Sequence, residues 1–267
     1  MDVQLVLDDL VAEQQELDRV VAALTPDQWA LPTPSPRWSV ADQIGHLAYF
    51  DTTAALAITD EAAFLAHRDG LLGSFADELA VDEATLGAFR RLTPTEQLAE
   101  WRRRRDELER AGRSLTAETR VQWYGPSMGS KSFLTARLME VWAHGQDVCD
   151  TVGAERAATD RLRHIAQLGV ITRGWSYAVR GETTPDEDVR VTLDAPSGDT
   201  WSWGPADAPA SIAGPAEDFC LVVTQRRHVD DTALTLDGHA ARDWMRKAQA
   251  FAGTPSDGPP PRTTGAH

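Results

Sequence analysis

The sequence predicts an α+β protein with a helical amino-terminal part and a smaller, mixed carboxy-terminal part. Two observations carry this prediction. Up to about residue 155, apolar residues recur at steps of three and four, which is the spacing of one helix face. Beyond residue 181, short segments alternate apolar and polar residues around turn formers, as half-buried strands do. Helices that precede a run of short strands indicate an α+β arrangement.

The first helices are predicted in this order. Residues 3–24 form an amphipathic helix, followed by a short turn, DQW. A proline-rich loop, LPTPSPR, then leads to a second helix that runs from about Val40 into the sixties. Ser39 and Asp42 give its start the S-x-x-D pattern of a capping box. Residues 60–89 should form two shorter helical pieces. The glycines expected to break them are Gly70, Gly73 and Gly87.

The next long helix has a clear start signal. Thr93 can cap it, Pro94 suits its first position, and Glu96 completes a capping box. Residues 101–110, WRRRRDELER, contain four successive arginines that invite a nucleic-acid interpretation. On a helix these arginines fan around the circumference among acidic residues, which favours a solvated, salt-bridged face.

A loop and a helix follow. Residues 121–133 are rich in turn formers and enter a helix at 136–153. Its apolar face comprises Leu138, Val141, Trp142, Val148 and Val152. The loop must pass near one end of this helix, so Trp123, Tyr124 and Ser127 are candidate contacts for a substrate or cofactor. Simple loop packing is the alternative for each of them.

The last third of the chain is predicted to form the mixed domain. Residues 161–180 form a helix that links the two parts. VRVTLDAP and TWSWG flank the turn PSGD as a hairpin, ASIAG is a further strand and ALTLDG the final one. Helices are expected at 216–226 and 239–251. The predicted divisions are 1–155 for the helical bundle, 156–252 for the linker helix and small α+β domain, and 253–267 for a disordered tail.

Composition and charge are typical of a globular protein without a nucleic-acid or membrane partner. Hydrophobic residues make up 42% and charged residues 25% of the chain. The 26 basic and 41 acidic residues give a net charge of −15, which disfavours nucleic acid and anionic membranes. The acidic start lacks the pattern of a signal peptide, and two cysteines are too few for a disulfide framework. We therefore expect a cytoplasmic monomer or homodimer that acts on a small molecule.

Three residues of the helical part could hold a metal ion. Glu140 and His144 stand four residues apart, so both project from one side of their helix. His46 lies one turn inside the second helix and would meet them in an antiparallel bundle. Two histidines and one carboxylate leave coordination positions open, as in catalytic zinc sites. The alternatives are a surface Glu–His contact worth roughly 0.2–0.5 kcal/mol and a core histidine with a backbone partner.

The same residues carry a family resemblance. W-S-V-A-D-Q-I-G-H-L, followed about ninety residues later by M-E-V-W-A-H-G-Q-D-V, resembles the DinB-like superfamily and, within it, the mycothiol-dependent maleylpyruvate isomerase group. ARLMEVWAHGQDV, QRRHVDDTAL and AQAFAG resemble an actinobacterial metal-binding subgroup of no settled activity. The motifs match at His46, Glu140 and His144. The resemblance implies a four-helix bundle with a divalent metal, usually zinc, and a second domain like a sterol carrier fold.

The resemblance also implies an activity. A low-molecular-weight thiol, mycothiol, would be activated by the metal for isomerisation of, or S-transfer to, a small electrophilic acid. Arg226 matches an arginine that reaches into the active site of the related isomerases, where it would bind a carboxylate. The family usually has glycine before that arginine, whereas this chain has Gln225, and an interdomain salt bridge is the alternative role. A thiol-independent hydrolase, lyase or cyclase, and a non-enzymatic binding module with a structural metal, also stay open.

Three further residues lie near the predicted ligands in the sequence. Asp147 follows His144 by three residues and could orient it, serve as a fourth ligand or lie exposed at the surface. Asp51 is five residues beyond His46, so its side chain should point less directly toward the predicted metal site. Cys149 is turned away from the ligand face and should be a small buried residue.

Overall fold

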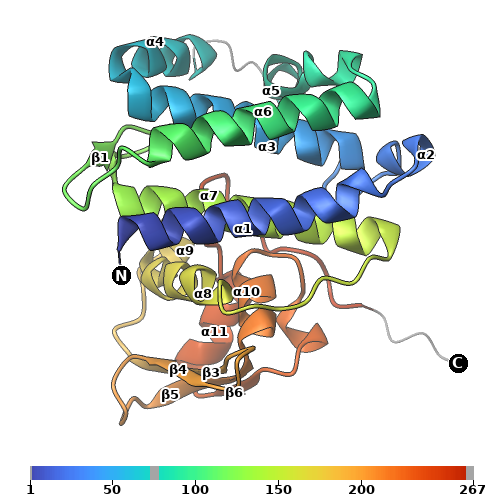
Figure 1. Cartoon of the computed structure of the whole chain (residues 1–267). Coiled ribbons are helices and arrows are strands. Elements are labelled where there is room, and N and C mark those ends of the chain that lie inside the picture. Colours follow the sequence, from blue (N-terminus) through green and yellow to red (C-terminus); the bar gives the residue numbers. More distant parts are fainter. Residues whose placement is uncertain (1, 73–77, 263–267) are drawn as a thin grey trace, which may run out of the picture. The chain divides into compact units, whose positions relative to one another are not determined.

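The computed structural model describes residues 2–72 and 78–262 of the chain (Figure 1). Contacts divide the chain into two compact units, Met1–Arg156 and Ala157–His267. The first is helical, and the second holds a mixed sheet with helices, so the predicted α+β class is confirmed. Within the described residues, no helix combines the length and apolar character that a membrane span requires.

The first unit contains seven α-helices among its described residues, one 3₁₀ helix and a short β-ladder. They are α1 (Val3–Ala22), α2 (Pro26–Trp29), α3 (Val40–Thr59), α4 (Glu61–Leu72), α5 (Glu78–Leu86), η1 (Phe89–Arg91), α6 (Pro94–Gly112), β1 (Arg120–Val121), β2 (Met128–Gly129) and α7 (Ser130–Val152).

Four long helices form a closed bundle. Both α1 and α3 contact α6 and α7, so the four helices follow one another around a shared core (Figure 1). Rising residue numbers in α3 meet falling numbers in α7, which makes these two helices antiparallel. The contacts that show this are Gln43 with His144, His46 with Glu140, and Asp51 with Arg137.

Local signals position the bundle helices as predicted. The Ser39 side chain accepts the Asp42 backbone N–H, and the Asp42 carboxylate accepts the Ser39 N–H at 2.9 Å. Thr93 and Glu96 form the same reciprocal cap at the start of α6. Because each cap satisfies backbone donors that a helix start leaves free, it fixes where the helix begins. The first of these caps sets the start of the helix that carries His46.

The helical expectations were wrong in three places. The second helix does not run into the sixties: Asp60 ends α3, and its side chain accepts the Ala63 N–H at 3.0 Å to start α4. Gly70 lies within α4 rather than breaking a helix, while Gly73 lies outside the described residues. The loop predicted at 121–133 includes the antiparallel β1–β2 ladder, and α7 starts at Ser130.

The second unit is built around a four-stranded sheet. Its elements are α8 (Leu162–Ile171), α9 (Arg173–Ala178), β3 (Val189–Asp194), β4 (Thr200–Trp203), β5 (Ala210–Pro215), α10 (Ala216–Val223), η2 (Val229–Asp231), β6 (Thr235–Asp237) and α11 (His239–Lys247). The strand order is β4-β3-β5-β6. β3 and β4 form the predicted antiparallel hairpin, β5 pairs parallel with β3, and β6 pairs antiparallel with β5.

The prediction of a single helix at 161–180 was wrong, and part of the predicted tail makes contacts. The helix expected at 161–180 is interrupted at Thr172, whose hydroxyl and backbone N–H both bond back to the Leu168 carbonyl. The tail residues 253–262 lack helix and strand but make contacts: the Gln225 side chain donates to the Ser256 carbonyl at 2.6 Å. The likeness of this unit to a sterol carrier fold stays a prediction.

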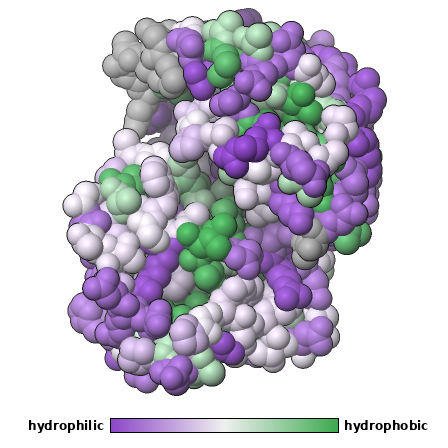
Figure 2. All heavy atoms as spheres, turned by 90° about the vertical axis from the view of Figure 1, so that its left-hand side faces the viewer, coloured by the Kyte–Doolittle hydropathy of each residue, from purple (hydrophilic) through white to green (hydrophobic). Residues whose placement is uncertain are grey.

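The arginine-rich segment of α6 forms the salt-bridged face that was predicted. Arg103 pairs with Glu100 at 2.7 Å and with Glu107 at 2.5 Å, and Arg102 pairs with Asp18 of α1 at 2.6 Å. These arginines are therefore neutralised by acidic neighbours. On the face shown in Figure 2, the surface is mostly hydrophilic and the hydrophobic side chains gather in separate patches.

A buried ion pair joins the two helices that carry the candidate metal ligands. Arg137 of α7 donates to Asp51 of α3 at 2.8 Å, and the two side chains are 3% and 0% exposed. Gln14 of α1 donates to the other carboxylate oxygen at 3.2 Å. Burial raises the pKa of Asp51 even with Arg137 beside it. Asp51 is thus a structural partner of Arg137.

We expect Arg137→Ala to lower the free energy of unfolding by about 3–5 kcal/mol, because it leaves the buried Asp51 without a positively charged partner. Arg113→Ala is the matched control, since Arg113 pairs with Asp8 and Glu109 but is 45% exposed; it should cost at most about 1 kcal/mol. Urea titration of both variants measures the difference. An equal loss of unfolding free energy in both variants would show that burial does not increase the contribution of the Asp51–Arg137 pair.

Candidate metal centre

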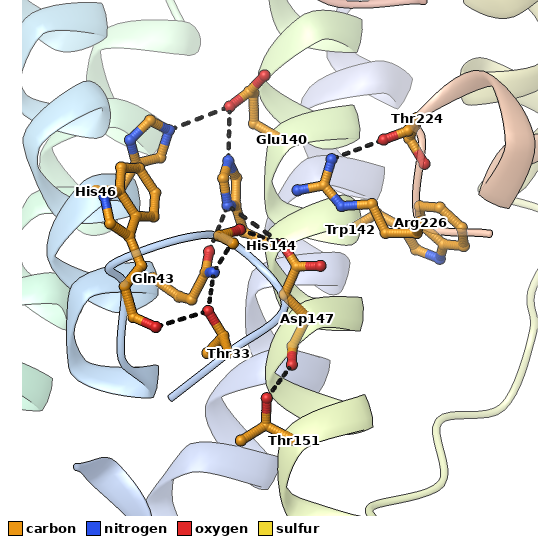
Figure 3. Close-up of polar contacts among 12 residues, drawn as sticks. Thr33, Gln43, His46, Glu140, Trp142, His144, Asp147, Thr151, Thr224 and Arg226 are labelled. Carbon is orange, nitrogen blue, oxygen red and sulfur yellow. Dashed lines mark hydrogen bonds and ion pairs between the residues drawn. The ribbon is translucent and has the colours of Figure 1, made fainter. Parts of the chain in front are cut away.

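Three side chains from α3 and α7 converge on one carboxylate oxygen. Nε2 of His46 lies 3.2 Å and Nε2 of His144 lies 3.1 Å from Oε2 of Glu140 (Figure 3). The four-residue step places Glu140 and His144 on one side of α7, and the antiparallel α3 brings His46 to the same point. The three candidate ligand atoms all lie within 4.8 Å of one another. The predicted meeting of these residues is therefore present.

Aromatic side chains enclose the two imidazoles. The Trp38 ring lies 4.9 Å from the ring of His46 and 5.9 Å from that of His144, measured between centroids. Phe50 lies 4.6 Å from His46 on the same helix. The side chains of His46, Glu140 and His144 keep 14%, 25% and 11% exposure, so the cluster is sheltered yet reachable from solvent. This rules out the predicted alternative of a surface Glu–His contact.

The ionisation of the cluster suits metal binding. Burial, together with the nearby His144, lowers the pKa of His46 to about 4, so its imidazole is neutral near pH 7. Burial alone would raise the pKa of Glu140, but hydrogen bonds with His144 and His46 hold it well below its usual range. Neutral imidazole and ionised carboxylate are the forms that bind a metal ion.

The donor set fits a divalent ion such as zinc. Zinc takes imidazole nitrogen and carboxylate oxygen at about 2.0–2.2 Å and usually has four ligands. Three protein donors would leave a position for a small molecule. An ion held by two neutral histidines and one carboxylate would keep a net positive charge and favour an anionic ligand.

Gln43 is the residue of this site that sequence reasoning missed. It is fully buried, and its Oε1 lies 2.5 Å from Nδ1 of His144. Its Nε2 donates to the hydroxyls of Thr33 and Ser35, at 2.8 and 3.0 Å. Gln43 precedes His46 by three residues and so shares its side of α3; that spacing was the one available signal.

Asp147 is neither exposed nor placed as a fourth ligand. It is 4% exposed, and its Oδ2 lies 3.9 Å from Nδ1 of His144, the nitrogen that points away from Glu140. Ser35 donates to the same Asp147 oxygen at 3.3 Å. Cys149 is 2% exposed, as predicted for a small buried residue.

Comparison with known proteins identifies the family. The family model described as mycothiol maleylpyruvate isomerase N-terminal domain matches residues 10–149, which is more than half of the chain. The chain belongs to this family. The match contains His46, Glu140 and His144, and it confirms the resemblance seen in the sequence. A second model, described as wyosine base formation, matches residues 185–236 of the second unit.

Two curated relatives and two solved structures are similar to most of this chain. Uncharacterised proteins from two strains of Mycobacterium tuberculosis, CDC 1551 and H37Rv, are each 45% identical over 253 residues, covering 94% of this chain and 96% of theirs. Crystal structures of the mycothiol-dependent maleylpyruvate isomerase and of its histidine-to-alanine mutant superpose with TM-scores of 0.57 and 0.59. At 18% identity, with 89% of this chain and 93% of theirs covered, they show a shared fold.

The loop before α7 lies close to this cluster. The Tyr124 and Trp123 rings lie 5.6 and 6.2 Å from Phe50, the ring that touches His46, and Trp123 stacks on Phe64 at 5.6 Å. Their contact with a substrate or cofactor stays a prediction. Ser127 instead accepts a hydrogen bond from Arg120 at 3.2 Å.

Arg226 lies in the second unit, in the turn after α10. Its Nη1 donates to the Thr224 carbonyl at 2.7 Å. Gln225 before it adopts a φ of 58°, a left-handed conformation that glycine takes without strain. Gln225 therefore holds this turn at some cost in backbone strain. The role of Arg226 in the site stays a prediction.

We expect alanine at His46, Glu140 or His144 to reduce bound metal by at least about tenfold, since losing a ligand costs more than losing a residue that supports one. His67→Ala is the control: it removes a histidine of the same unit that bonds to Tyr49 at 2.9 Å and is no member of the cluster. Elemental analysis of the purified variants measures the loss. Full occupancy in all three ligand variants would contradict the site.

Proposed function

We propose that this protein is a metal-dependent enzyme of the mycothiol-dependent maleylpyruvate isomerase type. It would activate a low-molecular-weight thiol for isomerisation of, or S-transfer to, a small electrophilic acid. The observation that carries this proposal is the convergence of two imidazole nitrogens on one carboxylate oxygen, with three protein donors in all. Family membership supports it independently.

The bound ion would supply one thing: a positive charge that lowers the pKa of a thiol, so that the sulfur acts as a thiolate near pH 7. The chain's own residues would set the conditions for this. Glu140 would offset one charge of the ion, and imidazole ligands, which bind a metal in their uncharged form, would leave the remainder in place. The rings of Phe50 and Trp38 cover the imidazoles and limit the access of water.

The reaction would balance without an added oxidant or reductant. The thiolate would add to one carbon of a double bond that is conjugated with a carbonyl group, and the electron pair of that bond would move onto the carbonyl oxygen. Rotation about the resulting single bond and elimination of the thiolate give the geometric isomer and return the thiol. If the adduct is instead released after protonation, the outcome is S-transfer.

Arg226 would bind the acid group of the substrate. Its planar guanidinium can donate two parallel hydrogen bonds to a carboxylate. Tyr124 and Trp123 would contact the thiol or the substrate from the loop before α7, because both rings pack on Phe50 beside His46. The proposal also includes the resemblance of the second unit to a sterol carrier fold.

Binding of the thiol should release a proton, because the thiol binds as its anion. Affinity should therefore rise with pH toward the pKa of the free thiol, about 8.5 for a cysteine-like group. Calorimetry of the zinc-loaded protein with mycothiol, in two buffers of different ionisation enthalpy, reports this proton directly. The His144→Ala variant should show no such heat.

An oxygen-for-sulfur analogue of mycothiol is the matched ligand control and should bind far more weakly, since a hydroxyl does not ionise in this pH range. Equal binding of thiol and analogue, or binding of neither, would defeat the thiol mechanism. An enzyme that activates water or a carbonyl group would then be the better account.

A further inference from the structure

A hydrogen-bond network that includes Thr33, Gln43 and Asp147 lies on the Nδ1 side of His144 (Figure 3). The donor and the acceptor of each hydrogen bond in this network can be assigned. Thr33 Oγ1 lies 2.9 Å from the Trp38 carbonyl oxygen, and Ser35 Oγ lies 3.3 Å from Oδ2 of Asp147. A carbonyl oxygen can only accept, so Thr33 donates its hydrogen to Trp38, and Ser35 donates its hydrogen to Asp147. Neither hydroxyl has a second hydrogen to donate.

The orientation of the Gln43 amide follows. Both hydroxyl oxygens also lie within 3.0 Å of one atom of this amide, and they can only accept from it. That atom must therefore be the NH₂ nitrogen, Nε2. The amide oxygen then faces His144, at 2.5 Å from Nδ1, and an amide oxygen can only accept. Nδ1 of His144 must carry the hydrogen.

We propose that Gln43 is a positioning residue that keeps a hydrogen on Nδ1 of His144 and thereby directs its Nε2 toward Glu140 and a metal ion bound there. This rests on the metal centre of the proposed function. With a hydrogen on Nδ1, only Nε2 of His144, which lies 3.1 Å from Oε2 of Glu140, is left to bind a metal ion.

An amide, rather than a carboxylate, as the partner of His144 Nδ1 affects the net charge of the metal centre. A histidine ligand often donates its other N–H to a carboxylate, which adds a negative charge behind the metal. Here Asp147 lies 3.9 Å from Nδ1, beyond hydrogen-bond distance, and the neutral Gln43 takes the contact. Because Gln43 is neutral, this contact itself adds no negative charge to the centre that would hold the ion.

Competition titration of zinc against a chromophoric chelator tests this on the full-length protein. Gln43→Met keeps the shape but removes the acceptor, and it should weaken zinc binding by about ten- to hundredfold. Gln43→Glu restores an acceptor and should bind zinc about as tightly as the original chain. Gln97→Met is the matched control: Gln97 is 2% exposed and donates to the Ala41 carbonyl, away from both histidines. It should leave zinc affinity unchanged.

A second readout does not depend on metal. Long-range ¹H–¹⁵N spectra of the full-length protein show directly which ring nitrogen of His144 carries a hydrogen. We expect Nδ1–H in the original chain and in Gln43→Glu, and a mixture in Gln43→Met. If Gln43→Met does not fold, the spectra of the original chain and of Gln43→Glu still test the proposal.

The Nε2–H tautomer in the original chain, or equal zinc affinity of Gln43→Met and the original chain, would overturn the proposal. Failure of the proposed function gives a different result. In that case the original chain would not bind zinc or thiol, while the tautomer of His144 would still be as expected.

Discussion

A single carboxylate oxygen, Oε2 of Glu140, is the point on which the site depends. Two imidazole nitrogens lie within 3.2 Å of it, in a bundle interior where aromatic rings cover the histidines. A half-buried carboxylate with two imidazoles against it is costly to desolvate, and a cation bound between them would offset that cost. The antiparallel pairing of α3 and α7 brings the three donors together, and Gln43 orients the ring of His144.

The scaffold holds α3 and α7 in register by interactions on either side of the cluster. One helical turn beyond His46, the buried Asp51–Arg137 pair joins the two helices. On the other side, Gln43 and Ser35 tie the proline-rich loop to His144 and Asp147. A slip of one helix along the other would break both connections. Site geometry and bundle stability are therefore linked through the same pair of helices.

Much of this could be predicted from local sequence. Capping boxes at Ser39 and Thr93 mark helix starts because their hydrogen bonds join residues three apart, and the four-residue step fixes Glu140 and His144 on one side. Other features depend on contacts between distant residues. Gln43 acquires its role because the loop at 33–35 folds back onto it, and Asp51 because Arg137 faces it. The β1–β2 strands are two residues each, too short to show a period. Asp60 was missed because apolar residues continue on both sides of it.

X-ray absorption at the zinc edge tests the central claim most directly, because it counts the atoms around the ion. The zinc-loaded protein should show nitrogen and oxygen neighbours at about 2.0–2.2 Å, and one sulfur at about 2.3 Å should appear when mycothiol is added. A spectrum that stays free of sulfur at saturating mycothiol would contradict the account. So would a sulfur neighbour present before any thiol is added, since the only ligands assigned here are His46, Glu140 and His144.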